Sequence, residues 1–170
     1  MKIKSYEDKL VKDDIEIDYY VPITVTFSEN DDKYSLGEFY YYRFVNEHES
    51  FIEIKINCVT QKILEIVFTS INDIEKSSCF IGEYVKKNPI VETDIFGENS
   101  IITIESGLKI VREQKKLYFK LNEEKIDSIV KMSNHVSLFL NENSEIIGLE
   151  FSNFSDNEWV ELNKSINSNA

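Results

Sequence analysis

The sequence predicts a mainly β (α+β) protein with two related antiparallel β-meanders, each followed by a helix, packed as one body. Three observations predict this fold: a repeated hydrophobic pattern, stretches in which apolar and polar residues alternate, and an abundance of β-branched and aromatic residues. Apolar residues at every second position suit a strand that buries one face.

The repeated pattern links residues 52–73 with residues 136–156. In each segment two apolar stretches flank a polar turn, which is one residue shorter in the second copy. Such a repeat indicates two copies of one supersecondary unit, here a β-hairpin. Only framework residues are repeated, so the pattern predicts architecture and no chemistry. The matched pairs are Ile52 with Val136, Ile54 with Leu138, Ile56 with Leu140, Asn57 with Asn141, Ile63 with Ile146, Leu64 with Ile147, Ile66 with Leu149, Phe68 with Phe151 and Asp73 with Asp156.

The first half, residues 1–86, is predicted to form the first meander. Its polar N-terminal segment is expected to be a frayed helix or an arm. Alternation from Ile15 to Phe27 predicts one long strand or two, with Pro22 at an edge or a bulge because proline cannot donate to a ladder. The other elements expected here are a turn at 28–33, an aromatic-rich strand at 36–45, the repeat hairpin and a short helix near 72–76.

The second half, residues 87–170, is predicted to echo this order. Strands are expected near 102–110 and at 117–121, the latter matching the aromatic-rich strand, whereas 122–132 fits either a strand or a helix. Ser155 and Glu158 form a capping-box pattern, so a helix is expected from Asp156 to Ile166 with Trp159 buried on the sheet.

One segment, from Lys116 to Asp156, also resembles a family of short bacterial proteins of unknown function. That family has a LYI-type strand, a variable polar connection, a strand that ends in an acidic or Asn turn, and a G-x-(I/V)-(I/V)-G-I-E-(I/V/F) strand. The residues that carry the resemblance are Leu117–Phe119, Val136–Asn141 and Glu145–Phe151. The resemblance implies a β-meander and no catalytic residues.

Composition bounds the function. A chain of 170 residues with 42% hydrophobic residues can bury a core as one compact unit. The net charge of −12 disfavours nucleic acid and anionic membrane; it is compatible with a basic protein partner and equally with a role in solubility alone. Residues 1–10 lack an apolar signal core, and no apolar run approaches the ~18 residues that span a bilayer. We therefore expect a cytoplasmic protein.

No pattern in the chain indicates catalysis or a cofactor. Cys58 and Cys79 lack CxxC spacing and are expected to be buried, reduced thiols. His48 and His135 each stand alone, and the run at 28–33 lacks the spacing of a calcium loop. There is no G-x-S-x-G and no glycine-rich phosphate loop. We expect no enzyme activity, no metal and no cofactor.

The aromatic cluster of the first half is the candidate binding site. Nine of the chain's aromatic residues lie at 19–44. On a strand, Phe39 and Tyr41 face one way and Tyr40 and Tyr42 the other, so one pair belongs to the core. We predict Tyr40 and Tyr42 as exposed anchors, with the alternative that their face is covered. The acids expected to form a charged rim are Asp31, Asp32, Glu47 and Glu49.

Together these features favour a non-enzymatic, acidic binding protein, in particular an immunity- or antitoxin-type inhibitor of a basic bacterial toxin. One alternative is a DNA-mimic inhibitor of a nucleic-acid-binding enzyme, which requires carboxylates spaced like phosphates on one face. The other is a small ligand-binding β-protein or a hydrolase without a recognisable motif, which requires a pocket with convergent polar groups.

Overall fold

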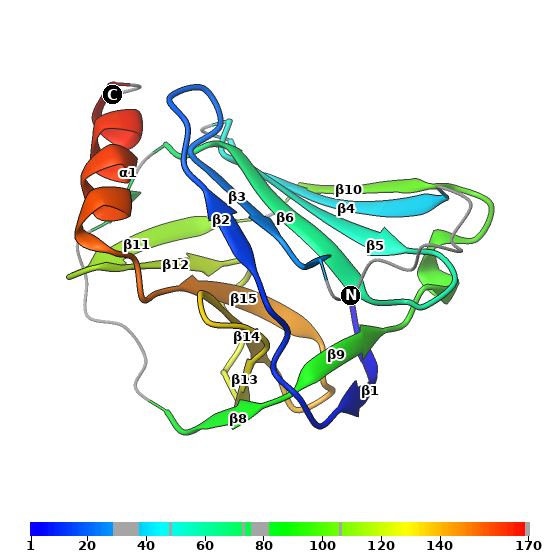
Figure 1. Ribbon diagram of the computed structural model, residues 1–170. Helices are drawn as coiled ribbons and strands as arrows, with labels where there is room; N and C mark the ends of the chain where they lie inside the picture. Colours follow the sequence, from blue (N-terminus) through cyan, green and yellow to red (C-terminus); the bar gives the residue numbers. More distant parts are fainter. Residues whose placement is uncertain (29–37, 48, 73, 76–81, 106, 169–170) are drawn as a thin grey trace.

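A computed structural model gives the structure of the protein and describes residues 1–28, 38–47, 49–72, 74–75, 82–105 and 107–168. The protein is mainly β, with one α-helix in these ranges, and the predicted fold class is confirmed at this level. Two large sheets face each other, and a two-stranded ribbon lies at one end (Figure 1).

The first large sheet has six strands in the order β10-β4-β5-β6-β3-β2. All neighbours are antiparallel except β10, which runs parallel to β4. The alternating segment 15–27 forms two strands, and Pro22 directly precedes the second, where no ladder hydrogen bond is lost. The strands are β2 (Asp14–Glu16), β3 (Ile23–Thr26), β4 (Phe39–Val45), β5 (Phe51–Asn57), β6 (Ile63–Ser70) and β10 (Ile101–Glu105).

The second large sheet has seven strands in the order β7-β11-β12-β15-β14-β13-β8. The helix predicted near 72–76 is wrong, because Ile74 and Glu75 pair with β11 as a strand and Ile74 packs against the core. The ambiguous stretch 122–132 contains a strand. The strands are β7 (Ile74–Glu75), β8 (Tyr84–Lys86), β11 (Lys109–Glu113), β12 (Lys116–Lys120), β13 (Ser128–Lys131), β14 (Val136–Leu140) and β15 (Ile146–Phe151).

The N-terminal segment is a strand and not a helix. β1 (Ile3–Glu7) pairs antiparallel with β9 (Asn88–Val91), which leads into the short 3-10 helix η2 (Asp94–Phe96). Single bridges join Lys2 to Glu145 and Lys62 to Ile90. The ribbon is thereby tied to both large sheets.

The two sheets share one strand order. β2 to β6 lie in the order β4-β5-β6-β3-β2, and β11 to β15 lie in the order β13-β14-β15-β12-β11. In both sheets the first strand of this order has a parallel neighbour: β10 lies beside β4, and β8 lies beside β13. By this order β12 corresponds to β3, so the predicted match of 117–121 with the aromatic-rich strand is wrong. The halves 1–86 and 87–170 exchange edge strands, since β7 and β8 join the second sheet and β10 the first.

The two repeat hairpins have equivalent registers. Ile52 stands opposite Phe68 and Ile54 opposite Ile66, as Val136 stands opposite Phe151 and Leu138 opposite Leu149. Both ladders shift by a bulge one step before the turn. The turns are also alike, because the side-chain oxygens of Asn57 and Asn141 each accept two backbone N–H groups.

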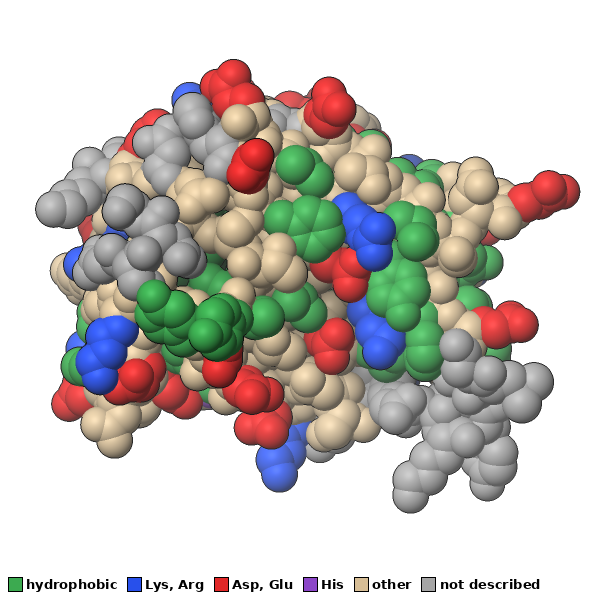
Figure 2. Space-filling view, turned by 90° about the horizontal axis from the view of Figure 1, so that it is seen from above, with side chains coloured by type: hydrophobic (Ala, Val, Ile, Leu, Met, Phe, Trp, Pro, Cys, Tyr) green, Lys and Arg blue, Asp and Glu red, His purple; other side chains and the backbone are tan. Residues whose placement is uncertain are grey.

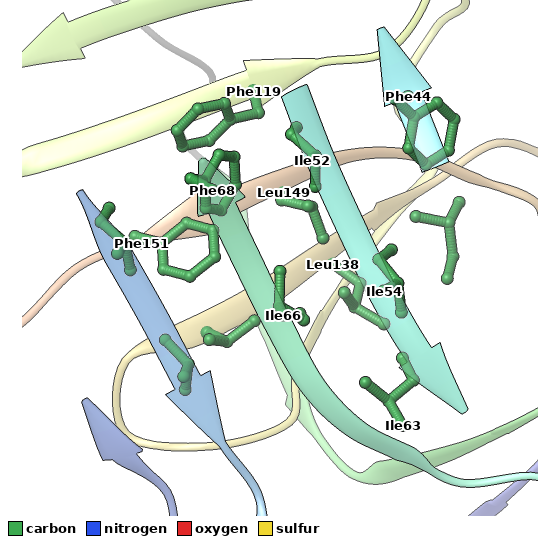
Figure 3. Packing of buried hydrophobic residues seen from close by; sticks show 14 of the residues in the cluster. Phe44, Ile52, Ile54, Ile63, Ile66, Phe68, Phe119, Leu138, Leu149 and Phe151 are labelled. Atoms are coloured by element: carbon green, nitrogen blue, oxygen red, sulfur yellow. The ribbon is translucent and has the colours of Figure 1, made fainter. Parts of the chain in front are cut away.

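The core lies between the facing sheets (Figure 3). Phe68 of β6 packs against Phe119 of β12 and Phe151 of β15, with ring centres 4.0 and 5.0 Å apart. Ile54 and Leu138, which lie on the apolar face of their alternating strands together with Phe68 and Phe151, are fully buried as well. The alternating pattern therefore identifies the inner face of both hairpins.

Helix α1 (Asp156–Ser168) begins with the predicted capping box. Glu158 N donates to Ser155 Oγ at 3.2 Å, and Ser155 N donates to Glu158 Oε2 at 2.6 Å. Leu162 is buried, but Trp159 is only half-buried, so the predicted burial of Trp159 on the sheet is wrong. The Trp159 ring rests on Phe154 at 5.5 Å because the helix stands at the side of the sheets rather than across a face (Figure 1).

Candidate functional site

Tyr40 and Tyr42, predicted as exposed anchors, turn toward the interior, so the predicted orientation is wrong. Tyr42 is buried, with its ring centre 6.1 Å from that of Phe96. Tyr40 is half-buried and stacks on the same Phe96 ring at 4.4 Å. The cause is strand register, since these tyrosines stand opposite the core residues Ile56 and Ile54.

The outer side of β4 and β5 carries the other set of side chains. We call Phe39, Tyr41, Arg43, Phe51 and Lys55 the aromatic–cation face. The Arg43 guanidinium lies 5.9 Å from the ring centres of both Tyr41 and Phe51, and Lys55 Nζ lies 4.4 Å from that of Phe39. These distances permit cation–π attraction. Figure 2 shows Lys and Arg side chains between hydrophobic ones on this side of the molecule.

Glu53 holds Arg43 in place on this face. The two residues stand opposite each other, and Arg43 Nε donates to Glu53 Oε2 at 2.6 Å. The Arg43 side chain keeps 32% of its surface exposed. Its remaining N–H donors therefore stay available to a partner while the side chain is already ordered.

A cavity of about 340 Å³ adjoins one end of the aromatic–cation face, and we call it the acidic pocket. Phe39, Tyr40 and Tyr41 supply aromatic surface to its wall, and Glu38 and Glu98 supply carboxylates. The rest of the lining is Cys58 and the loop from Gly97 to Ser100. An opening with aromatic walls and two acids is suited to a cationic side chain.

The thiol in this pocket is poorly suited to act as a nucleophile. Burial, and next the charge of Glu38, raise the pKa of Cys58, so less thiolate is present near neutral pH. The second cysteine, Cys79, lies outside the described residues.

Two acids of the predicted rim, Glu47 and Glu49, are exposed in the turn between β4 and β5. Asn46 anchors this turn, because Ser50 N donates to its Oδ1 at 2.8 Å and its Nδ2 donates to the Leu108 carbonyl at 3.0 Å. The turn is at the far end of β4 from the acidic pocket, so acids lie beyond both ends of the strand.

The predicted rim residues Asp31 and Asp32 lie outside the described residues, as does His48.

A buried Asp–His pair escaped the sequence analysis. Asp13 Oδ2 accepts from His135 N at 2.9 Å and contacts His135 Nδ1 at 3.1 Å. Burial is the largest effect on the pKa of Asp13 and raises it, but hydrogen bonds from His135 and Ser133 outweigh it and leave the pKa lowered. Since Val11 N also donates to the Met132 carbonyl, the pair fastens the N-terminal arm to the β13–β14 turn. No local signal reveals it, because Asp13 and His135 are 122 positions apart.

A second buried carboxylate, Glu150, lies on the outer side of β15. Tyr84 Oη donates to its Oε2 at 2.9 Å, and Lys116 Nζ lies 3.4 Å from the same oxygen. Burial, and next the bond to Glu150, raise the pKa of Tyr84 to about 12. The Glu150 carboxylate is therefore closed in by its own partners.

A further cavity, of about 360 Å³, opens between the sheets beside Tyr42 and Phe44 of β4 and Glu145 of the β14–β15 turn. The Met1 amino group donates to Tyr42 Oη at 3.4 Å. Burial, and next Glu145, raise the pKa of Tyr42, so the phenol stays protonated at neutral pH. In this cavity the Met1 amino group, the Tyr42 phenol and the Glu145 carboxylate thus interact with one another.

Within the residues that the structure describes, no three His, Cys, Asp or Glu side chains are grouped so that they could hold a metal ion. The described part of the chain also has no helix that is long and apolar enough to cross a membrane.

No protein-family model matches the chain, and no curated protein matches it.

Proposed function

We propose that this protein binds a basic protein partner without turnover, as an immunity- or antitoxin-type inhibitor binds a toxin domain. The observation that carries the proposal is the acidic pocket beside the aromatic–cation face. Its wall includes Phe39 and Tyr41, and its carboxylates are Glu38 and Glu98. A lysine or arginine of a basic partner would find both ring surfaces and negative charge there.

The aromatic–cation face supplies residue types that dominate binding energies at protein interfaces. Tyr and Arg are enriched among hot spots, and a hot spot typically costs at least ~2 kcal/mol when it is truncated. Arg43 is already held by Glu53 and lies near two rings, so less conformational freedom is lost on binding. These features favour Tyr41 and Arg43 as anchors in place of Tyr40 and Tyr42.

The charge of the chain supports a basic partner. A net charge of −12 attracts a basic protein over distances near the Debye length and raises its association rate. The DNA-mimic alternative is less well supported, because Arg43 and Lys55 interrupt the carboxylates on this face. A phosphate-like row would need acids without such cations between them.

We further infer that the fold is a duplication of one five-stranded unit, which is a finer form of the predicted two-meander arrangement. The shared strand order and the equivalent hairpin registers support this inference. The resemblance of residues 116–156 to short β-meander proteins fits this inference, because that range holds four strands of the second unit, β12 to β15. One copy of the unit comprises β11 to β15.

The test begins with a basic protein that the wild-type chain captures from its native host and that is then purified. Tyr41→Ala, and separately Glu38→Gln combined with Glu98→Gln, should weaken its binding in calorimetry by at least tenfold, since an anchor contributes ~2 kcal/mol. The matched control is Tyr20→Ala, which removes a tyrosine that is 82% exposed and lies outside the face. The captured protein should also lose its own activity in a one-to-one complex.

The proposal is refuted if Tyr20→Ala weakens binding while Tyr41→Ala does not. It is equally refuted if no basic protein is captured, or if the captured protein is consumed as a substrate.

A further inference from the structure

A smaller cavity lies on the outer side of the seven-stranded sheet, which is the opposite side of the molecule from the aromatic–cation face. Its volume is about 210 Å³. Apolar side chains of Phe139, Ile147 and Ile126 line it, and Lys120, Lys125 and Glu124 are among the polar residues around it. This cavity is independent of the proposed function.

The apolar lining is built by a close contact that only glycine allows. A Cβ at Gly148 would lie 2.9 Å from Phe139 Cδ2 and 2.8 Å from the Phe119 carbonyl oxygen. The Phe139 ring therefore lies close over the bare backbone of Gly148 and stacks with Tyr118 at 6.1 Å. Phe139 and Ile147 are buried and belong to a separate apolar cluster on this side of the sheet. The lining is thus fixed before any ligand arrives.

The acids of the loop that edges the cavity already have partners. Glu123 pairs with Lys109 at 2.5 Å. Glu124 accepts from Asn122 Nδ2 at 3.0 Å and also from Asn141 Nδ2. The bond from Asn141 joins the loop to the end of β14. The position of Glu124 is therefore set by amide donors, which leave its negative charge in place.

The two lysines at the cavity differ from these acids. In the described part of the chain, neither Lys120 nor Lys125 has a carboxylate within 4 Å. Lys120 contributes only a weak electrostatic effect on Glu123, which is held by Lys109. Among the described residues, two lysines without a close carboxylate therefore line an apolar cavity, on a chain whose net charge is −12.

We propose that this cavity binds a small amphipathic monoanion, a carboxylate that carries one aromatic ring or a short alkyl chain. The apolar part lies against Phe139, Ile147 and Ile126, because small-molecule sites are mainly apolar with a few polar groups that set orientation. The carboxylate points to the ammonium groups of Lys120 and Lys125. Glu124 disfavours a second negative charge, so dicarboxylates bind more weakly.

The experiment titrates the full chain with hexanoate and with phenylpropionate, and follows backbone amide signals by NMR. Each probe should shift signals of Ile126, Phe139 and Ile147 in a saturable way, and the neutral alcohols of the same carbon skeletons should bind more weakly. Lys120→Gln combined with Lys125→Gln should weaken anion binding roughly fivefold, as expected for exposed charge pairs. The matched control, Lys12→Gln, removes an exposed lysine on the N-terminal arm and should change nothing.

Because surface lysine variants leave the core intact, the double variant is expected to fold, and its amide spectrum verifies this. The proposal is overturned if the probes shift no signals at the cavity up to their solubility limit. It is also overturned if the double variant and Lys12→Gln bind the anions alike, or if the neutral alcohols bind as well as the carboxylates.

Discussion

Gly148→Ala tests whether Phe139 and strand β12 pack as closely against Gly148 as described for the outer side of the seven-stranded sheet. The added methyl would lie 2.8 Å from the Phe119 carbonyl oxygen and 2.9 Å from Phe139 Cδ2, and neither approach is tolerated by real Cβ atoms. The first neighbour is backbone of the adjacent strand β12, which is hydrogen-bonded and cannot move aside alone. Phe139 is buried against Tyr118, so its ring cannot swing to solvent without loss of packing.

The expected cost is about 2–3 kcal/mol, at the upper end of the range for overpacked cores, because two rigid neighbours are involved. Urea unfolding, followed by fluorescence of the single Trp159, gives the free energy of unfolding. The matched control is Gly107→Ala, whose added methyl would meet nothing within 4 Å. It should change stability by no more than about 0.5 kcal/mol.

Phe139→Leu in the Gly148→Ala background separates the two contacts. It should recover only part of the lost stability, since the approach to the Phe119 carbonyl remains. Equal stabilities of Gly148→Ala and Gly107→Ala would refute the packing described for this strand. Full recovery by Phe139→Leu would show that β12 is farther from β15 than the structure has it.

Three further predictions concern the Asp13–His135 pair and helix α1. Because the pKa of Asp13 is lowered by its partners, the stability it contributes is present above its ordinary value of 3.8 and is lost as pH falls through the lower, folded-state pKa. Asp13→Asn should therefore flatten the pH dependence of the urea midpoint at and below pH 3.8. An unchanged pH profile would contradict the hydrogen bonds between Asp13 and His135. Ser155→Ala should cost about 1 kcal/mol by loss of the cap, measured by urea unfolding, whereas Ser155→Asp should keep most of it. Trp159→Ala should cost roughly 2 kcal/mol by circular dichroism melting, below the 3–5 typical of fully buried aromatics, because Trp159 is half-buried; a cost within the latter range would show that the helix covers it fully.

Much of the framework could be predicted from local sequence, because strand alternation and capping act over a few residues. Ile54, Phe68, Leu138 and Phe151 were assigned to the interior by period-two alternation, and all four are buried. The capping box at Ser155 was assigned from two residues three positions apart and is present. In both cases the pattern that identifies the feature spans only a few residues, although the buried side chains meet partners that are distant in the sequence.

Local sequence does not predict which face of the aromatic-rich strand β4 points to the core. Alternation separates Tyr40 and Tyr42 from Phe39 and Tyr41, but it does not say which pair is inside. That choice depends on the partner strand, whose Ile54 and Ile56 are inward and draw Tyr42 and Tyr40 with them. The parallel strand β10 beside β4 is likewise a long-range pairing, with Ile101 opposite Tyr41. Side assignment in a sheet is thus a tertiary property.

When the two hairpins are aligned by register, the residues that face the core are alike in type and the residues on the outer faces of the sheets differ. Glu53 of β5 occupies the position of Ser137 in β14, and Lys55 occupies that of Phe139. On the second sheet this outer position is buried in an apolar cluster, whereas on the first the charged side chain remains partly exposed. If both hairpins descend from one unit, the second acquired an outer apolar layer of its own and the first kept a charged, aromatic surface. The proposed partner site therefore lies on the outer face of the six-stranded sheet, whereas Phe139, at an equivalent position in β14, belongs to the apolar cluster that lines the proposed anion cavity.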